Sequence, residues 1–262
     1  MLKGLVVLMV LLCGSMTARA DAGADCNQPQ DPDRGIRGCT EYIRQNPSNK
    51  TKLAAAYYNR GAAYRAKGDN DRAIADYSKA IEINPKDAEA YTNRGAAYQD
   101  KGDSDRAFAD HSKAIEVNPK LAAAYYNRGN AYSDKGDNDR AIADHSKAIE
   151  INPKHAMAYT NRGNAYAGKG QYDRAIADYI KAIEINPKYA LAYYNRGNAY
   201  RDKGDNDRAI QDFDEAIRLN PNYAEAFYLR GFALRRLGQQ ARAAADFAKA
   251  GQLNPNLRPP KE

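Results

Sequence analysis

The sequence predicts an all-α fold, a solenoid in which helical hairpins stack one on the next. Two regularities lead to this prediction. The dipeptide Asn-Pro and the glycine of an Arg-Gly pair both return every 34 residues along most of the chain. Within each interval the apolar residues lie three or four positions apart in two runs, which is the spacing of two amphipathic helices separated by a break.

Residues 1–20 have the pattern of an export signal. Lys3 supplies a positive charge, residues 4–12 form an apolar run, and Ala18 and Ala20 are the small residues that a signal peptidase requires. We expect cleavage near Ala20 and a periplasmic or extracellular location. A retained membrane anchor is the alternative, but the apolar run is shorter than the roughly 20 residues that span a bilayer.

The net charge of the chain is mildly positive. Residues 1–20 contain Lys3, Arg19 and no acid, so their removal turns 40 basic and 33 acidic residues into 38 and 33, a net charge of +5 (38 − 33). The two signs alternate along the chain instead of clustering, and export would separate the protein from cellular nucleic acid. We therefore expect no nucleic-acid partner.

Residues 21–53 should form a capped N-terminal end. Residues 34–47 align with the second helix of a repeat, for example residues 72–85, and so predict a half-repeat that covers the first full unit. Residues 21–33 are mostly Pro, Asp, Gln and Gly, and we expect irregular structure there.

Cys26 and Cys39 are the two cysteines that remain after cleavage. An even number of cysteines in an oxidising compartment predicts a disulfide, and closing a loop of this length contributes roughly 3 kcal/mol in the chain-entropy model. Two buried free thiols are the alternative.

Six full units follow. They span residues 54–87, 88–121, 122–155, 156–189, 190–223 and 224–257, and residues 258–262 form a tail. In the third unit Tyr125, Gly129 and Tyr132 share one helical face. Asp137 is placed to cap the second helix, and Pro153 ends it because proline cannot donate a backbone hydrogen bond.

The repeat resembles the tetratricopeptide repeat. The matching pattern is an aromatic residue at position 4, Gly at position 8, Tyr at position 11, Ala at positions 20 and 27, and Pro at position 32 of each unit. The resemblance implies a right-handed superhelix whose first helices line a concave groove. It also implies a scaffold that binds a protein or peptide, with no catalysis and no cofactor.

One position departs from the family pattern, because arginine fills position 7, which is usually apolar. The equally persistent acid on the second helix is at position 23, so we predict six pairs within the units. These pairs are Arg60–Asp76, Arg94–Asp110, Arg128–Asp144, Arg162–Asp178, Arg196–Asp212 and Arg230–Asp246. The sequence leaves open whether they are buried or solvated.

The resemblance also implies which positions hold a ligand, namely positions 2, 5, 6, 9 and 12 on the first helix. The candidate binding residues are Tyr58, Asn59, Asn93, Tyr126, Asn127, Asn130, Asn161, Asn164, Tyr194, Asn195, Asn198 and Arg201. Position 5 also holds Thr92 and Thr160. Asparagine both donates and accepts, so repeated asparagines could pair with the backbone of an extended peptide. Alternatively, the asparagines at position 6 bridge neighbouring helices.

Two other functions receive less support. The family's carboxylate clamp needs lysine at position 5, which this chain lacks. Self-assembly into a homo-oligomer through the sixth unit is the alternative function, suggested by its apolar substitutions Leu229, Phe232, Leu234 and Leu237.

No pattern in the chain is typical of an enzyme or a metal site. His111 and His145 occupy position 24, where other units have Tyr or Phe, so we expect them to pack in the core. Phosphate loops, nucleophile elbows and paired catalytic carboxylates are absent from the sequence. We therefore expect no cofactor, no metal and no catalysis.

Overall fold

The structure is a computed structural model that describes residues 22–27, 30–45 and 48–257. The predicted export signal and the predicted tail lie outside these ranges. Within them, no helix has both the length and the apolar character that a membrane crossing requires.

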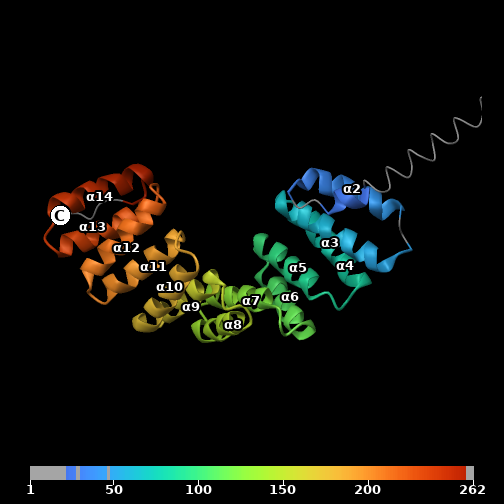
Figure 1. Ribbon diagram of the computed structural model, residues 1–262, viewed down its shortest axis with the longest axis horizontal. Helices are drawn as coiled ribbons and strands as arrows, with labels where there is room; N and C mark the ends of the chain where they lie inside the picture. Colours follow the sequence, from blue (N-terminus) through green and yellow to red (C-terminus); the bar gives the residue numbers. More distant parts are fainter. Residues whose placement is uncertain (1–21, 28–29, 46–47, 258–262) are drawn as a thin grey trace, which may run out of the picture. The chain divides into compact units, whose positions relative to one another are not determined.

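The described residues form helices and no strand (Figure 1), which confirms the predicted all-α fold of stacked hairpins. The helices are α2 (Pro32–Gln45), α3 (Lys50–Ala66), α4 (Asn70–Ile83), α5 (Ala88–Asp100), α6 (Ser104–Val117), α7 (Ala122–Asp134), α8 (Asn138–Ile151), α9 (Ala156–Gly168), α10 (Tyr172–Ile185), α11 (Ala190–Asp202), α12 (Asn206–Leu219), α13 (Ala224–Arg236) and α14 (Gln240–Leu253).

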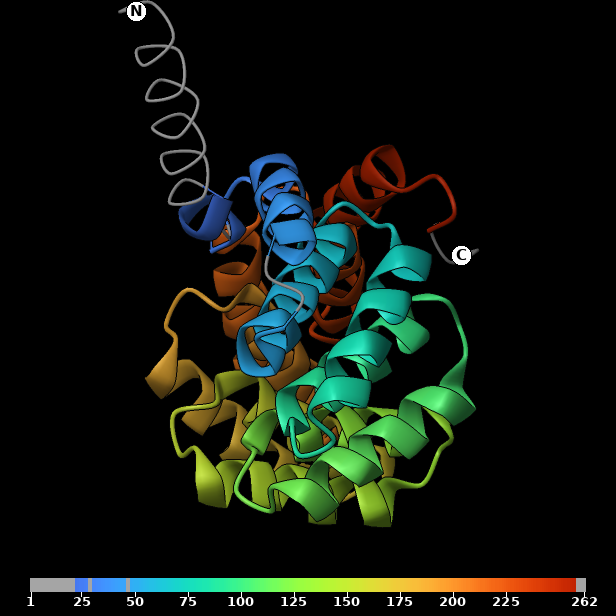
Figure 2. The same cartoon turned by 90° about the vertical axis from the view of Figure 1, so that its right-hand side faces the viewer.

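The chain divides into two bodies, of which the first ends at Asn127 and the second begins at Arg128. In the first body α3 packs on α4 and α5 on α6, and α4 also packs on α5. Figure 2 turns this body toward the viewer and shows the helices running alongside their neighbours. In the second body α9 packs on α10, α11 on α12 and α13 on α14. Each hairpin thus covers the next within its body.

The turn inside a hairpin contains a glycine with positive φ, and in four hairpins an aspartate that caps the second helix follows it. Gly136 has a φ of 75°, which a residue with a side chain rarely adopts. The carboxylate of Asp137 then accepts a hydrogen bond from the backbone N–H of Arg140, so the predicted cap of α8 is confirmed. Asp69, Asp103 and Asp205 cap their helices in the same way.

The core of a hairpin is built from small residues facing one large ring. Alanines at positions 20 and 27, such as Ala175 and Ala182, are fully buried. Gly163 lies against the ring of Tyr179 so closely that a Cβ on this glycine would be 2.7 Å from Cε1. A larger residue would separate the two helices. His111 and His145 are also fully buried at position 24, as the sequence predicts.

All six predicted Arg–Asp pairs are present, and they are buried on the acid side. Each guanidinium donates two hydrogen bonds to one carboxylate, and the aspartates are only 5–6% exposed. In the fourth unit the two distances from Arg162 to Asp178 are 2.8 and 2.7 Å. These hydrogen bonds raise the pKa of Arg162, which therefore stays charged.

The same arginines also join successive units. Arg94 donates from Nη1 to the hydroxyl of Ser78 at 3.0 Å, and Arg162 donates to Ser146 at 3.0 Å. Both serines are at position 25 of the preceding unit. One guanidinium thus holds its own hairpin closed and fixes it against its neighbour.

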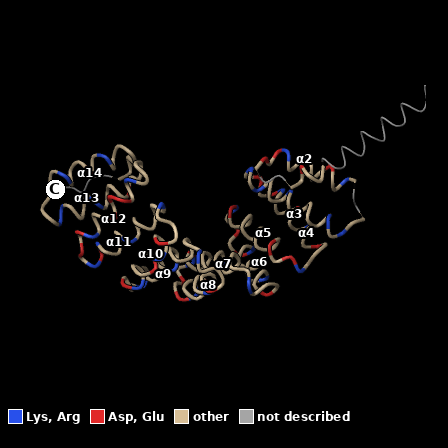
Figure 3. Tube along the Cα trace, in the orientation of Figure 1, with Lys and Arg blue, Asp and Glu red and all other residues tan. Residues whose placement is uncertain are grey.

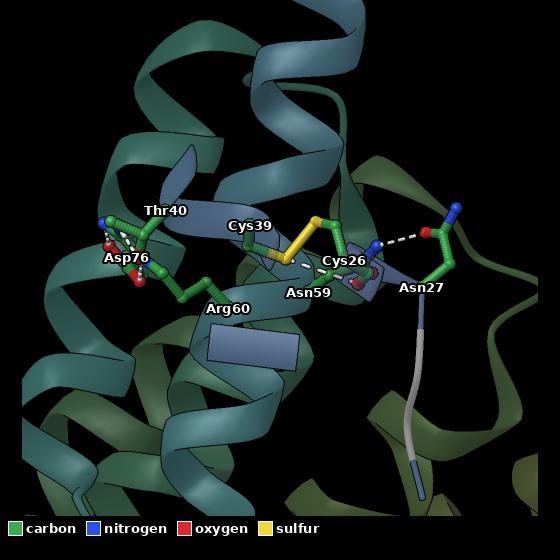
Figure 4. The surroundings of a disulfide bond; sticks show 7 residues. All are labelled: Cys26, Asn27, Cys39, Thr40, Asn59, Arg60 and Asp76. Carbon is green, nitrogen blue, oxygen red and sulfur yellow. Dashed lines mark hydrogen bonds and ion pairs between the residues drawn. A yellow bond between two sulfur atoms is a disulfide. The ribbon is translucent and has the colours of Figure 1, made fainter. Parts of the chain in front are cut away.

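The N-terminal end differs from the prediction in one respect. Residues 22–26, expected to be irregular, are helical. Figure 4 shows Cys26 of this turn joined to Cys39 of α2, with 2.05 Å between the sulfur atoms. A Cβ on Gly38 would collide with the Cβ of Asp25, so the turn packs directly on α2. This packing, which composition does not reveal, orders the segment.

The helical turn and α2 together make the same kinds of contact with α3 that a complete repeat makes with the repeat after it. Asn59 of α3 donates to Asn27 at 2.8 Å, and Arg60 donates from Nη1 to Thr40 at 3.0 Å (Figure 4). Thr40 takes the place of the position-25 serine of a full unit, and Asn27 supplies an acceptor beside α3. We name residues 22–45 the N-terminal cap.

Replacing Arg162 should test the buried pairs. Arg162→Met leaves Asp178 charged and buried, and we expect a loss of about 3 kcal/mol in the free energy of unfolding. Urea denaturation followed by circular dichroism measures it. The double variant Arg162→Met, Asp178→Leu should recover most of the loss.

The matched control is Lys181→Met, which breaks an exposed pair with Glu184 of the same unit. It should change the urea midpoint little, because exposed pairs are screened by solvent. A loss as large as that of Arg162→Met would show that position 7 has no special role.

The cap can be tested by removing both cysteines. In Cys26→Ser, Cys39→Ser we expect faster hydrogen exchange in α2 and α3, with α11 to α14 unchanged because repeats contact only their neighbours. Loss of the cross-link should cost at most roughly 3 kcal/mol. Thiol labelling of the unreduced wild-type protein must find neither cysteine free, or the disulfide prediction is wrong.

Stability should fall in acid because of His145. Burial lowers the pKa of this imidazole from its ordinary value of 6.5 to about 4. The unfolded chain therefore binds a proton more readily between these values, so stability is complete above pH 6.5 and falls toward pH 4, by up to about 3 kcal/mol from this group. His145→Phe, which has the ring of Phe213 at the same position, should lose less stability between pH 7 and pH 4. Identical losses in urea denaturation would refute the assignment.

Candidate protein-binding surface

Asparagines on successive first helices bond to one another. Asn161 of α9 donates from Nδ2 to Oδ1 of Asn130 of α7 at 2.8 Å. Asn195 of α11 donates in the same way to Asn164 of α9 at 2.9 Å. Each bond joins position 6 of one unit to position 9 of the unit before it. We call these four residues the asparagine ladder.

In the first unit a tyrosine hydroxyl takes the place of the asparagine acceptor at position 9. Position 9 of the first unit is Ala62, and Asn93 donates instead to the hydroxyl of Tyr58 at 2.6 Å. Tyr58 also donates to Glu89 at 3.5 Å. Burial is the main cause that raises the pKa of Tyr58 to about 12, so this hydroxyl keeps its proton.

Two hollows lie beside the bond between Asn27 and Asn59. One has a volume of about 300 Å³ and is lined in part by Tyr42, Lys52 and Ala55. The other, of about 310 Å³, is lined mainly by small residues such as Ala62 and Ala66. Both hollows reach α3, so the first helix of the first unit borders open space.

The tyrosines and threonines at position 5 behave differently. Tyr126 and Tyr194 are half-buried, and the ring of Tyr194 stacks on that of Tyr223 at 4.8 Å. Thr92 and Thr160 are buried, and their hydroxyls donate to backbone carbonyls of their own helices. Position 5 is therefore available to a ligand only where its side chain is long.

The ladder ends at the sixth unit. Asn127 and Asn198 are half-buried, and Oδ1 of Asn198 is a buried acceptor that has no hydrogen-bond partner among the described residues. Position 6 of the sixth unit is Leu229, whose side chain has no N–H to donate. Arg201, a candidate binding residue, forms an ion pair with Asp202 at 2.7 Å.

The apolar residues proposed for self-assembly are not equally exposed. Leu234 is 1% exposed and belongs to the core of the last hairpins, so the expectation that it offers a contact surface is wrong. It occupies position 11, where the other units pack a tyrosine, and the period itself could have identified it. Leu237 is exposed, as are Met157 and Leu191 at position 2 of their units.

The ladder has amide groups left for a ligand. Its bonds use Oδ1 of the position-9 residue and one N–H of the position-6 residue. Asn130 and Asn164 thus retain their Nδ2 groups, which can donate to a carbonyl. Asn164 is also fixed by a bond from the hydroxyl of Tyr179 at 2.8 Å. Among the described residues, no group of three or more His, Cys, Asp or Glu side chains could hold a metal ion.

Family models of the tetratricopeptide repeat match the chain repeatedly. A model described as a TPR repeat matches residues 61–102, 163–201 and 197–238. Models described as the tetratricopeptide repeat match residues 88–121, 122–155, 146–177 and 224–257. Together these matches run without a gap from residue 61 to residue 257. The chain matches none of the curated proteins with which it was compared.

Solved structures show the same fold. A structure of the MamA protein is 32% identical over 67% of this chain and 96% of its own, with a TM-score of 0.57. YrrB, described as a TPR protein with an unusual peptide-binding site, is 26% identical over 73% of this chain and 97% of its own, with a TM-score of 0.59.

A third structure, PilF of Pseudomonas aeruginosa, is similar in fold alone. It is 18% identical over 79% of this chain and 95% of its own, with a TM-score of 0.71. The repeated family matches, the 34-residue period and the stacked hairpins agree with one another. The chain belongs to the tetratricopeptide-repeat family.

Proposed function

We propose that the protein is an exported adaptor that holds an extended segment of a partner protein against the first helices of its hairpins. Tetratricopeptide-repeat proteins are in general protein-interaction scaffolds, and this chain is one at that level. The observation that carries the finer proposal is the asparagine ladder, which orients amide groups along α7, α9 and α11.

The ladder favours an extended backbone as the ligand. Its hydrogen bonds fix the side chains before binding, so little side-chain entropy is lost when a ligand arrives. The Nδ2 groups of Asn130 and Asn164 recur once per unit and can donate to successive backbone carbonyls. Such contacts are independent of the ligand's side chains, so specificity must come from neighbouring residues.

Exposed apolar residues can supply part of this specificity. Met157 is 48% exposed and Leu191 is 37% exposed, both on first helices. Methionine adapts its shape to different partners, which suits a surface that binds a peptide. The similarity to YrrB supports the same proposal, because that protein is described as having a peptide-binding site.

Export remains part of the proposal. It is motivated by the signal-like residues 1–20 and by the position of Cys26 and Cys39, which are close enough to be joined. Mass spectrometry of the protein recovered from cells should find a chain that begins near Asp21. A chain that retains Met1 in the cytosol would overturn this part of the proposal.

Substituting aspartate in the ladder separates its two roles. Asn130→Asp with Asn164→Asp keeps the Oδ1 acceptors that hold the ladder together but removes the N–H donors. We expect roughly tenfold weaker binding, the effect of losing about 1.4 kcal/mol of hydrogen bonding. Pull-down with quantitative mass spectrometry identifies the partner, and titration calorimetry with the bound segment measures the affinity.

The matched control is Asn222→Asp with Asn256→Asp, which adds the same two charges at exposed turns. It should bind the segment like the wild type. Unchanged affinity in the ladder variant would remove the groove from the mechanism. If light scattering finds dimers or larger species of the wild type, the alternative prediction of self-assembly gains support, although Leu234 cannot provide that contact.

A further inference from the structure

The sixth unit has apolar residues on the helix face that carries the asparagine ladder in earlier units. Leu229 and Phe232 of α13 stand at positions 6 and 9, where the fifth unit has asparagines. Arg235 follows Phe232 by three residues, so the three side chains share one face of the helix. The sixth unit therefore presents an apolar and cationic surface in place of amides.

Arg235 differs from the other arginines at position 12. Arg65 pairs with Asp100 at 2.9 Å, and Arg201 pairs with Asp202 at 2.7 Å. Both of these acids are at position 13 of their units, where the sixth unit has Arg236. Within the described ranges no carboxylate forms an ion pair with Arg235 or Arg236. A position that is acidic in the second, third and fifth units is thus basic in the sixth.

Aromatic rings hold Arg235 in place. Its guanidinium carbon is 5.2 Å from the centroid of Phe232 and 5.9 Å from that of Phe247. The two phenylalanine rings meet edge to face at 5.1 Å, and Tyr228 packs against Phe232 at 4.9 Å. A guanidinium that lies over rings keeps its N–H donors for a carboxylate.

The net charge of the sixth unit also favours an acidic ligand. Residues 224–257 contain five basic and two acidic residues, a net charge of +3 (5 − 2). One of the two acids, Asp246, is buried in its pair with Arg230. Figure 3 shows basic segments predominating over α13 and α14. Cations in a last turn also suit the helix dipole, but the dipole does not require the aromatic rings beneath Arg235.

We infer that Leu229, Phe232 and Arg235 form a site for an acidic segment of the partner protein, in which a carboxylate side chain binds the guanidinium and an adjacent apolar side chain packs on Phe232. This inference rests on the proposed function, since it assigns partner chemistry to the first helices. An acidic sequence is the occupant that complements the uncompensated arginines.

The test uses a short fluorescein-labelled peptide that alternates glutamate with phenylalanine and is amidated at its C-terminus. Amidation ensures that side-chain carboxylates, not a terminal one, are measured. Fluorescence anisotropy with the purified protein should show saturable binding that weakens with salt. A matched peptide with lysine in place of every glutamate should not bind.

Two variants and one control locate the site. Arg235→Gln should weaken binding roughly tenfold, as expected for a charge-assisted hydrogen bond. Phe232→Asn, which restores the residue of the fifth unit, should weaken it as well. Arg242→Gln removes the same charge from α14, where Arg242 binds Gln239 rather than a carboxylate, and should bind like the wild type. Circular dichroism confirms that each variant is folded.

Three results would overturn the inference. They are equal weakening by Arg235→Gln and Arg242→Gln, equal binding of the lysine peptide, and the absence of saturable binding to the wild type. The ladder variant Asn130→Asp, Asn164→Asp separates the two proposals. If it loses the natural partner while Arg235→Gln binds that partner normally, the groove stands and the acidic-segment site fails.

Discussion

The buried pair between an arginine at position 7 and an aspartate at position 23 is the interaction on which the array depends. Two parallel hydrogen bonds fix the distance and the rotation between the helices of a hairpin. A third bond from the same guanidinium reaches the preceding hairpin in several units. Closure within a unit and stacking between units thus share one charged group. The small residues at positions 8, 20 and 27 then let the helices approach to the distance that this group requires.

The sequence predicts this arrangement because the residues involved repeat. An arginine at position 7 and an aspartate at position 23, such as Arg162 and Asp178, occur in every unit. Their pairing can therefore be predicted without coordinates. The hairpins follow from two helical patterns and a glycine turn, and the buried histidines follow from sharing a position with tyrosine and phenylalanine. Periodic features were therefore predictable together with their roles. Burial of the pairs was left open, since spacing alone does not show how much solvent reaches a carboxylate.

Other features depend on the angle between neighbouring hairpins or on a substitution in a single unit. The 34-residue period of the sequence gives no information about either. The bond from Asn161 to Asn130 links residues 31 positions apart, which meet only through the rotation of one unit against the next. Thr160 turns its hydroxyl to its own helix because its side chain is too short to reach farther. The helical turn at residues 22–26 forms through contacts with α2, although glycine and aspartate in that segment suggested a loop. The binding surface was consequently less predictable than the scaffold that presents it.

The N-terminal cap offers α3 the same chemical groups that each full unit offers to the one after it. Asn27 accepts from position 6, Thr40 accepts from position 7, and Asp33 pairs with Lys67 at position 14, as Asp71 pairs with Lys101 one unit later. The cap is therefore compatible with the first face of several units, because those units carry the same arginine and lysine. Duplication of the second unit, for example, would set a new Arg94 and Lys101 against Ser112 and Asp105, so the added junction would have the same donors and acceptors. The length of such a protein can change over evolutionary time without any new interface having to arise.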